Sequence, residues 1–222
     1  MKIIRFLAAT LTALLFAAPI LRAQDFSKYR DFSLGTNLAT VLKRTDKKLT
    51  DINTTHAAPT LFQELTWWPP SLPGPSSRSD SVEQVFFYFF NGELYKIGVS
   101  YDQSATEGLT ADDMVKSISV KYGAPTSVPE AASLSVGYDT QQSTVAAWED
   151  SLYSFNLVRT TFTDRFGLVI YSKKLNSDAQ LALVEVTKKE KQDAPAREAE
   201  RQKKQIDALE LTRQQNRKSF RP

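Results

Sequence analysis

The chain has 222 residues, of which 41% are hydrophobic, 11% aromatic and 24% charged, with a formal net charge of +3. This composition is typical of one globular domain or two small ones, and it argues against wholesale disorder. Cysteine is absent and histidine occurs once. That excludes disulfides and a thiol nucleophile, and it argues against a histidine-based metal site or catalytic triad. The sequence therefore predicts no metal site and no cofactor.

The first 23 residues have the pattern of a signal peptide. Lys2 and Arg5 precede an apolar run over 6–21, and Ala23 is a small residue at the expected cleavage site. The run is shorter than the roughly 20 residues that a membrane span needs. We expect cleavage after Ala23, a periplasmic or secreted location, and no transmembrane span in the mature chain.

The basic character of the precursor comes from this leader. The leader carries three of the 28 Lys and Arg residues and no acidic residue, so 25 residues of each sign remain. A mature chain with no net charge gives no electrostatic argument for binding nucleic acid. We expect no nucleic-acid partner.

The mature chain begins with a predicted helix and strand. Apolar residues recur at helical spacing and predict a helix over about 37–45, with Thr36 or Asn37 as the candidate N-cap. Residues 62–67 predict a short strand, which ends at the Pro69-Pro70 pair because proline cannot donate to a strand ladder. A loop rich in proline and serine follows, over 69–80.

Asn91-Gly92 lies between two strongly β-forming runs and predicts a tight hairpin. The first run, 85–90 (VFFYFF), is apolar at every position, so we expect a central strand covered on both faces. The second run, 93–101, alternates between apolar and polar residues after its first positions. We expect one of its faces to meet water.

A second helix is predicted over 110–123, with Thr110 as N-cap and Gly123 at the C-terminal end. Three strand candidates follow. They span residues 145–148, 153–162 and 166–171.

The order helix and three strands thus occurs twice, in possible half-repeats 31–102 and 109–173. Trp68 and Trp148 fall in the equivalent first strands of the two halves. The alternative is a coincidence between two unrelated stretches. The predicted fold class is α+β, an antiparallel sheet packed by two short helices in a globular region over 24–174.

The last segment, 175–222, is a charged tail, which we expect to be helical or partly disordered. Leu181, Val184 and Val186 are candidates to dock on the sheet, and Pro195 is expected to end or restart the helix. Beyond it the helix is polar nearly all round. Such a helix is solvated or forms a coiled contact with a partner.

The motif over 32–36 (FSLGT) leads into the first helix and is later followed by 91–97 (NGELYKI). It resembles the secreted bacterial modules of the SmpA/OmlA outer-membrane assembly type, and two such modules in tandem resemble the β-lactamase-inhibitor-protein fold. The resemblance covers about residues 31–172. It implies helices on one face of an antiparallel sheet and a function in binding other proteins. The assembly proteins carry a lipidated cysteine, which this chain lacks, and no site residue is transferred.

The candidate binding surface is Trp67-Trp68-Pro69-Pro70. Tryptophan beside a proline-fixed loop makes a rigid surface that loses little entropy on binding. Consecutive strand residues point to opposite faces, so we expect one tryptophan to be buried and the other to face outward.

We predict a non-catalytic exported binding module with a protein partner in the cell envelope. The partner would contact the sheet face or the two tryptophans. No catalytic residue is assigned, and we expect His56 to be an exposed loop histidine.

Two alternatives remain open. A cell-envelope hydrolase would use carboxylates such as Glu64 and Glu149. A carrier of a small apolar ligand would need a cavity lined by Phe86, Phe87, Tyr88 and their neighbours. The sequence leaves the oligomeric state undetermined.

Overall fold

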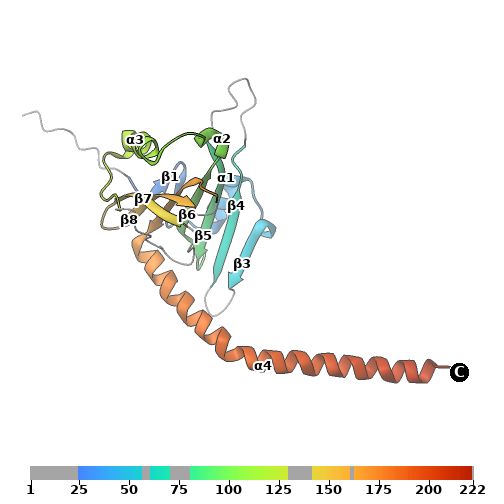
Figure 1. Ribbon diagram of the computed structural model, residues 1–222. Helices are drawn as coiled ribbons and strands as arrows, with labels where there is room; N and C mark the ends of the chain where they lie inside the picture. The colour runs from blue at the N-terminus through green and yellow to red at the C-terminus, as the bar shows by residue number, and fades with distance from the viewer. Residues whose placement is uncertain (1–24, 57–60, 71–80, 130–141, 161–162, 222) are drawn as a thin grey trace, which may run out of the picture.

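The protein is α+β, as predicted, and a computed structural model describes residues 25–56, 61–70, 81–129, 142–160 and 163–221 (Figure 1). The predicted signal peptide lies outside these ranges. The main sheet has seven antiparallel strands in the order β3-β4-β5-β6-β9-β8-β7. In chain order they are β3 (Ile52–His56), β4 (Phe62–Trp67), β5 (Val82–Phe90), β6 (Glu93–Tyr101), β7 (Gln142–Glu149), β8 (Tyr153–Thr160) and β9 (Phe166–Ser172).

The helices lie on both sides of the main sheet. The remaining elements are β1 (Lys28–Tyr29), β2 (Phe32–Ser33), α1 (Leu38–Thr45), the 3-10 helix η1 (Leu49–Asp51), α2 (Gln103–Thr106), α3 (Ala111–Tyr122) and α4 (Lys173–Ser219). The β1-β2 hairpin, α1 and α3 pack with one face of the sheet in the larger hydrophobic core. We call this the covered face. The start of α4 packs on the opposite face, which we call the groove face.

The covered face supplies most of the apolar core. Leu65, Phe87, Ile97, Ile170 and Trp148, on five different strands, are each 0% exposed. Burial of such side chains is the main favourable contribution to folding, at about 2 kcal/mol each. This core fixes the positions of the strands from which the groove face is built.

Local sequence signals define the predicted helix ends and hairpin. The backbone N–H of Thr40 donates to the side chain of Asn37 over 2.9 Å, which caps α1. Thr110 and Asp113 exchange side-chain and backbone hydrogen bonds in a capping box at the start of α3. Asn91 and Gly92 both have positive φ, 50° and 82°, as the tight turn requires.

The two predicted half-repeats occupy equivalent places in the sheet. β4-β5-β6 and β7-β8-β9 meet where β6 pairs with β9, and each trio follows a short helix. The first half also contains β3, an edge strand that was not predicted because its sequence, INTTH, is polar and does not alternate. This arrangement fits a duplication, which stays a prediction.

Residues 85–90 form a central strand as expected, but the expectation that both of its faces are covered holds only in part. β5 buries Val85, Phe87 and Phe89, but Phe86 and Tyr88 on the groove face are only half-buried. The start of α4 covers only one end of that face, so the aromatic rings farther along the strand remain accessible from the groove.

The docking residues predicted for the tail are partly wrong. Leu181 and Val184 are 67% and 63% exposed, whereas Ala179 and Val186 are each 1% exposed. The buried stripe of α4 runs through Leu175, Ala179, Leu183 and Val186 at helical spacing of three and four. Leu181 and Val184 lie off that stripe, on the outer side of the helix.

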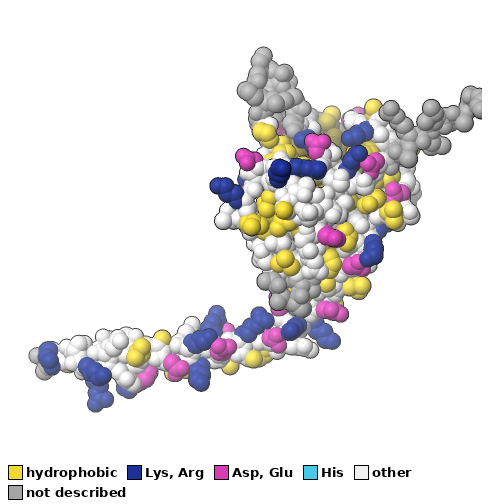
Figure 2. Space-filling view, turned by 180° about the vertical axis from the view of Figure 1, so that it is seen from behind, with side chains coloured by type: hydrophobic (Ala, Val, Ile, Leu, Met, Phe, Trp, Pro, Cys, Tyr) yellow, Lys and Arg dark blue, Asp and Glu magenta, His cyan; other side chains and the backbone are white. Residues whose placement is uncertain are grey.

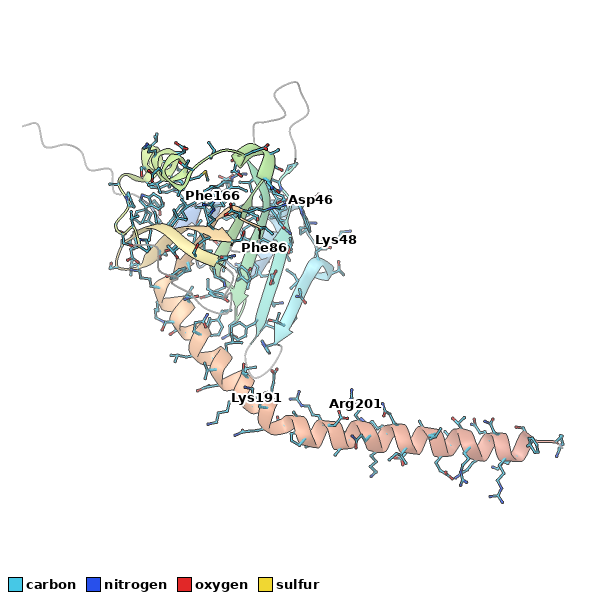
Figure 3. The ribbon with its side chains drawn as sticks, in the orientation of Figure 1. Asp46, Lys48, Phe86, Phe166, Lys191 and Arg201 are labelled. Atoms are coloured by element: carbon cyan, nitrogen blue, oxygen red, sulfur yellow. The ribbon has the colours of Figure 1, made fainter. Side chains whose placement is uncertain are left out.

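Pro195 neither ends nor restarts the helix, because α4 continues through it for 47 residues in all. Figure 3 shows α4 bending close to Lys191, the residue four positions before the proline. A proline ring displaces the carbonyl of residue i−4 and removes its hydrogen bond, which bends the helix there.

The second part of α4 projects from the globular body as an arm. Every residue from 196 to 221 except Glu210 is exposed. Figure 2 shows Lys and Arg side chains along this arm and few hydrophobic ones. Among the described residues, no helix combines the length and the apolar character that a membrane span requires.

Candidate functional site

The groove face is hollowed into a cavity of about 870 Å³, lined by residues of all seven strands and α4. Its volume lies within the range typical of small-molecule sites. Figure 3 labels two of its aromatic residues, Phe86 and Phe166, within the sheet. The aromatic and aliphatic side chains among its lining residues include Phe62, Phe86, Tyr88, Tyr95, Val158, Val169, Tyr171 and Leu183.

Small residues at the centre of the sheet create the hollow. Gly98 and Ser100 on β6 and Gly167 on β9 line its floor, where the two half-sheets join. A Cβ on Gly98 would lie 3.6 Å from the Phe86 and Tyr88 side chains, an ordinary contact. A Cβ on Gly167 would lie 2.6 Å from the carbonyl oxygen of Val99, which no side chain tolerates.

A row of polar side chains crosses the groove on four neighbouring strands. Glu64 is paired with Tyr88, Tyr88 with Lys96, and Lys96 with Tyr171, so all four point to the same face. The Lys96 ammonium lies 4.2 Å from the centroid of the Tyr88 ring and 6.0 Å from that of Tyr95. Both rings attract the cation through their negative faces. Lys96 is thereby held over β5, toward Glu64.

In the groove, Tyr95 is buried and Glu64 is half-buried. Burial raises the pKa of the Glu64 carboxyl, and the positive charge of Lys96 partly opposes this effect. Burial raises the pKa of the Tyr95 hydroxyl to about 12, and the nearby Glu64 charge contributes in the same direction. Both shifts follow because a charge is less stable where water is excluded.

We expect Glu64→Gln to stabilise the protein at neutral pH. A carboxyl whose pKa is raised in the folded state holds its proton more tightly there than in the unfolded chain. Stability then falls as the pH rises from the ordinary pKa of glutamate to the raised one, and this loss persists above it. Glutamine removes the loss. Thermal unfolding should show a higher Tm for the variant at pH 7 and a difference that shrinks toward about pH 4. A variant that is less stable at pH 7 contradicts this expectation.

His56 is not in a loop, contrary to expectation. It is the last residue of the edge strand β3, and its Nδ1 lies 2.9 Å from Oε1 of Glu190 on α4. Its ring also lies edge-on to Phe62, with 5.8 Å between centroids. The histidine thus joins the edge of the groove to α4, at a side-chain exposure of 20%.

Of the two tryptophans of the candidate surface, one faces outward as expected, whereas the other is only half-buried. Trp67 is half-buried on the covered face, with its ring 5.6 Å from Phe32 and 6.4 Å from Phe87. Trp68 is 57% exposed, and the Lys47 ammonium lies 5.7 Å from its ring centroid. Neither tryptophan lines the groove, so their surface and the groove are different sites.

Pro69 is half-buried and Pro70 is exposed, immediately after Trp68. The loop that follows, residues 71–80, lies outside the described part of the chain. The proline pair therefore ends β4 as predicted and adds no contact to the groove.

The sheet does not bring Glu64 and Glu149 together. They lie five strand spacings apart, which is about 24 Å along the sheet at the usual distance between strands. Paired glycosidase carboxylates lie within about 10 Å of each other. Glu149 instead pairs with Lys173, with 2.9 Å between Nζ and Oε2. Among the described lining residues, Glu64 is the one carboxylate of the groove.

The cavity expected for an apolar-ligand carrier is present in part. Phe86 and Tyr88 line it, but the Phe87 side chain faces the opposite core and is fully buried. Within the described ranges, no three His, Asp or Glu side chains are grouped as metal ligands.

Lys96 and the two floor glycines, Gly98 and Gly167, were not among the site residues predicted from the sequence. A period-two pattern was visible at 96, 98 and 100, and it placed these residues on a face exposed to water. The glycine positions in particular distinguish a hollow from a flat solvated face, because they leave room between aromatic neighbours.

Comparisons with protein-family models, curated proteins and solved structures gave no match. The resemblance to outer-membrane assembly modules and to the tandem inhibitor fold therefore stays a prediction.

Proposed function

We propose that the chain is an exported, non-catalytic binding protein that holds a small, largely apolar ligand in the groove of the main sheet. The observation that carries this proposal is the cavity of about 870 Å³ on the groove face, lined by aromatic and aliphatic side chains. Binding sites for small molecules have this size and this apolar character, with few polar groups to orient the ligand.

The charged groups of the groove favour binding over hydrolysis. Acid–base hydrolysis by carboxylates needs two of them in reach of one bond. The described lining offers one, Glu64, and the second candidate lies on the far strand β7 in an ion pair. Glu64 and Lys96 instead suit the orientation of a bound ligand.

Filling the groove tests the proposal. Gly98→Val adds branched bulk between Phe86 and Tyr88, and valine favours strands, so the variant should fold. We expect calorimetry with n-decanol and 2-naphthol to show binding by the wild-type chain and at least about tenfold weaker binding by the valine variant.

Gly98→Ala is the matched control, because its methyl group makes only ordinary contacts. It should bind both probes nearly as the wild type does. Equal affinities for the wild type and the valine variant, or no binding of either probe by the wild type, overturn the proposal.

We propose Trp68 as the contact for an envelope protein partner, a second site independent of the groove. Its support is the exposure of a large indole, 57%, directly before the two prolines that constrain the chain. We expect a pull-down from envelope extract with the wild-type chain to recover a partner protein. Trp68→Ala should abolish the recovery of this protein, whereas Gly98→Val should leave it unchanged. The opposite pattern would place the partner in the groove.

A further inference from the structure

On the groove face, a row that contains two charged side chains lies next to an apolar row. Glu64 and Lys96 lie in the sheet row next to the part covered by α4, which adds the amide side chains of Asn176 and Gln180. One row farther from α4, Phe86 pairs with Gly98 and Gly98 with Val169 on the same face. A ligand that spans both rows is therefore amphipathic, with its polar head at the row nearer α4.

The row nearer α4 contains one charge of each sign. Glu64 and Lys96 are on β4 and β6, separated only by β5, and the Lys96 ammonium leans over Tyr88 of that intervening strand. Each charge influences the other, since Lys96 acts electrostatically on the Glu64 carboxyl. The ionisable side chains in the described lining are Glu64, Lys96, His56 and the tyrosines. Glu64 and Lys96 are the carboxylate and the ammonium among them.

The pair of Glu64 and Lys96 discriminates between the polar head groups of ligands by their charge. A head that carries only a negative charge is attracted by Lys96 and repelled by Glu64, and a purely positive head meets the reverse. Both effects are stronger than at a fully exposed site because Glu64 and Lys96 are half-buried. A head with both charges is attracted by both side chains at once.

We propose that the groove takes a small amphipathic zwitterion, with its anionic group at Lys96, its cationic group at Glu64 and its apolar body over Gly98 and Val169. This inference rests on the proposed function, because it assigns the ligand of the same groove. The aromatic faces of Tyr88 and Tyr95 hold Lys96 in place, so the cation is positioned before the ligand arrives.

Four probes with one ten-carbon chain and different heads test the proposal. They are n-decanol, decanoate, decyltrimethylammonium and N-decyl-N,N-dimethylglycine, the last of which is zwitterionic. We expect calorimetry on the full mature chain, below the micelle concentration of each probe, to show about tenfold tighter binding of the zwitterion than of either singly charged probe.

Two variants should each change which of the charged probes binds most tightly. Lys96→Met leaves Glu64 alone, so decyltrimethylammonium should bind at least as tightly as the zwitterion. Glu64→Gln removes the negative charge and keeps that of Lys96, so decanoate should bind at least as tightly as the zwitterion. Circular dichroism and thermal unfolding confirm that each variant is folded before binding is compared.

The outcomes separate this inference from the proposed function. If wild-type protein binds decanol but binds a singly charged probe as tightly as the zwitterion, or if both variants keep the wild-type order, the zwitterion proposal is overturned and the groove remains a binding site. If no probe binds, including decanol, both proposals fail.

A zwitterionic head occurs in bilayer lipids and in free small molecules. Sedimentation with phosphatidylcholine vesicles distinguishes these sources. Co-sedimentation that Gly98→Val abolishes supports a lipid headgroup, whereas binding of the soluble zwitterion without co-sedimentation supports a free ligand.

Discussion

Trp148→Ala is expected to lower the free energy of unfolding by about 4 kcal/mol, the usual cost of removing a large buried aromatic side chain. Trp148 is 0% exposed, its ring lies edge-on to Phe155 at 6.1 Å, and its Nε1 donates to the carbonyl oxygen of Gly123 over 2.8 Å. The substitution therefore leaves a cavity in the covered face and removes the hydrogen bond from the end of α3. Urea unfolding measures the loss.

Trp148→Phe is the control for this prediction. Phenylalanine keeps most of the ring packing and loses the indole N–H, so a smaller loss is expected, about 2 kcal/mol from the hydrogen bond and the reduced volume. A similar loss in both variants would show that the hydrogen bond to Gly123, not the packing, dominates the contribution of Trp148.

Gly167→Ala is expected to destabilise the protein by about 3 kcal/mol, at the upper end of what overpacking costs. The added Cβ would lie 2.6 Å from the carbonyl oxygen of Val99, which belongs to the neighbouring strand. Backbone cannot yield as the end of a side chain can, so β6 and β9 must move apart at the centre of the sheet. Urea unfolding of the wild type and the variant gives the difference.

Gly98→Ala provides the matched comparison, since the same methyl group added to the other floor glycine meets side chains at 3.6 Å. We expect its stability to remain within about 0.5 kcal/mol of the wild type. Equal stabilities for the two alanine variants would contradict the close approach of β6 and β9. The contrast also bears on the groove, because its floor depends on that approach.

Much of the fold is predictable because its signals are local. The strand at 62–67, the hairpin at Asn91-Gly92 and the capped helix after Thr110 each follow from a few neighbouring residues. The edge strand β3 is not predictable in this way. Its residues are polar, and it exists because its backbone pairs with β4.

The groove could not be predicted from neighbouring residues either, because it also depends on pairing between strands. The alternation of β6 placed Lys96 and Gly98 on one face, but that pattern is equally typical of a face open to water. Only the pairing of β6 with β9 brings Gly98 next to Val169, and only α4, more than 70 residues later, covers one end of that face. Which side chains share a hollow depends on strand order and on the covering helix.

The tail also combines a feature that local sequence predicts with one that only packing decides. Helix propensity predicted a helical tail. Which side of that helix contacts the sheet depended on how the helix packs on the groove face. Packing selected Ala179 and Val186 over Leu181 and Val184.

By itself, the sequence determined the α+β class, most element positions and the separation of Trp67 from Trp68, because periodicity, caps and turns act over a few residues. The tertiary structure alone decided the groove and its pair of opposite charges, because these depend on contacts between residues far apart in the chain.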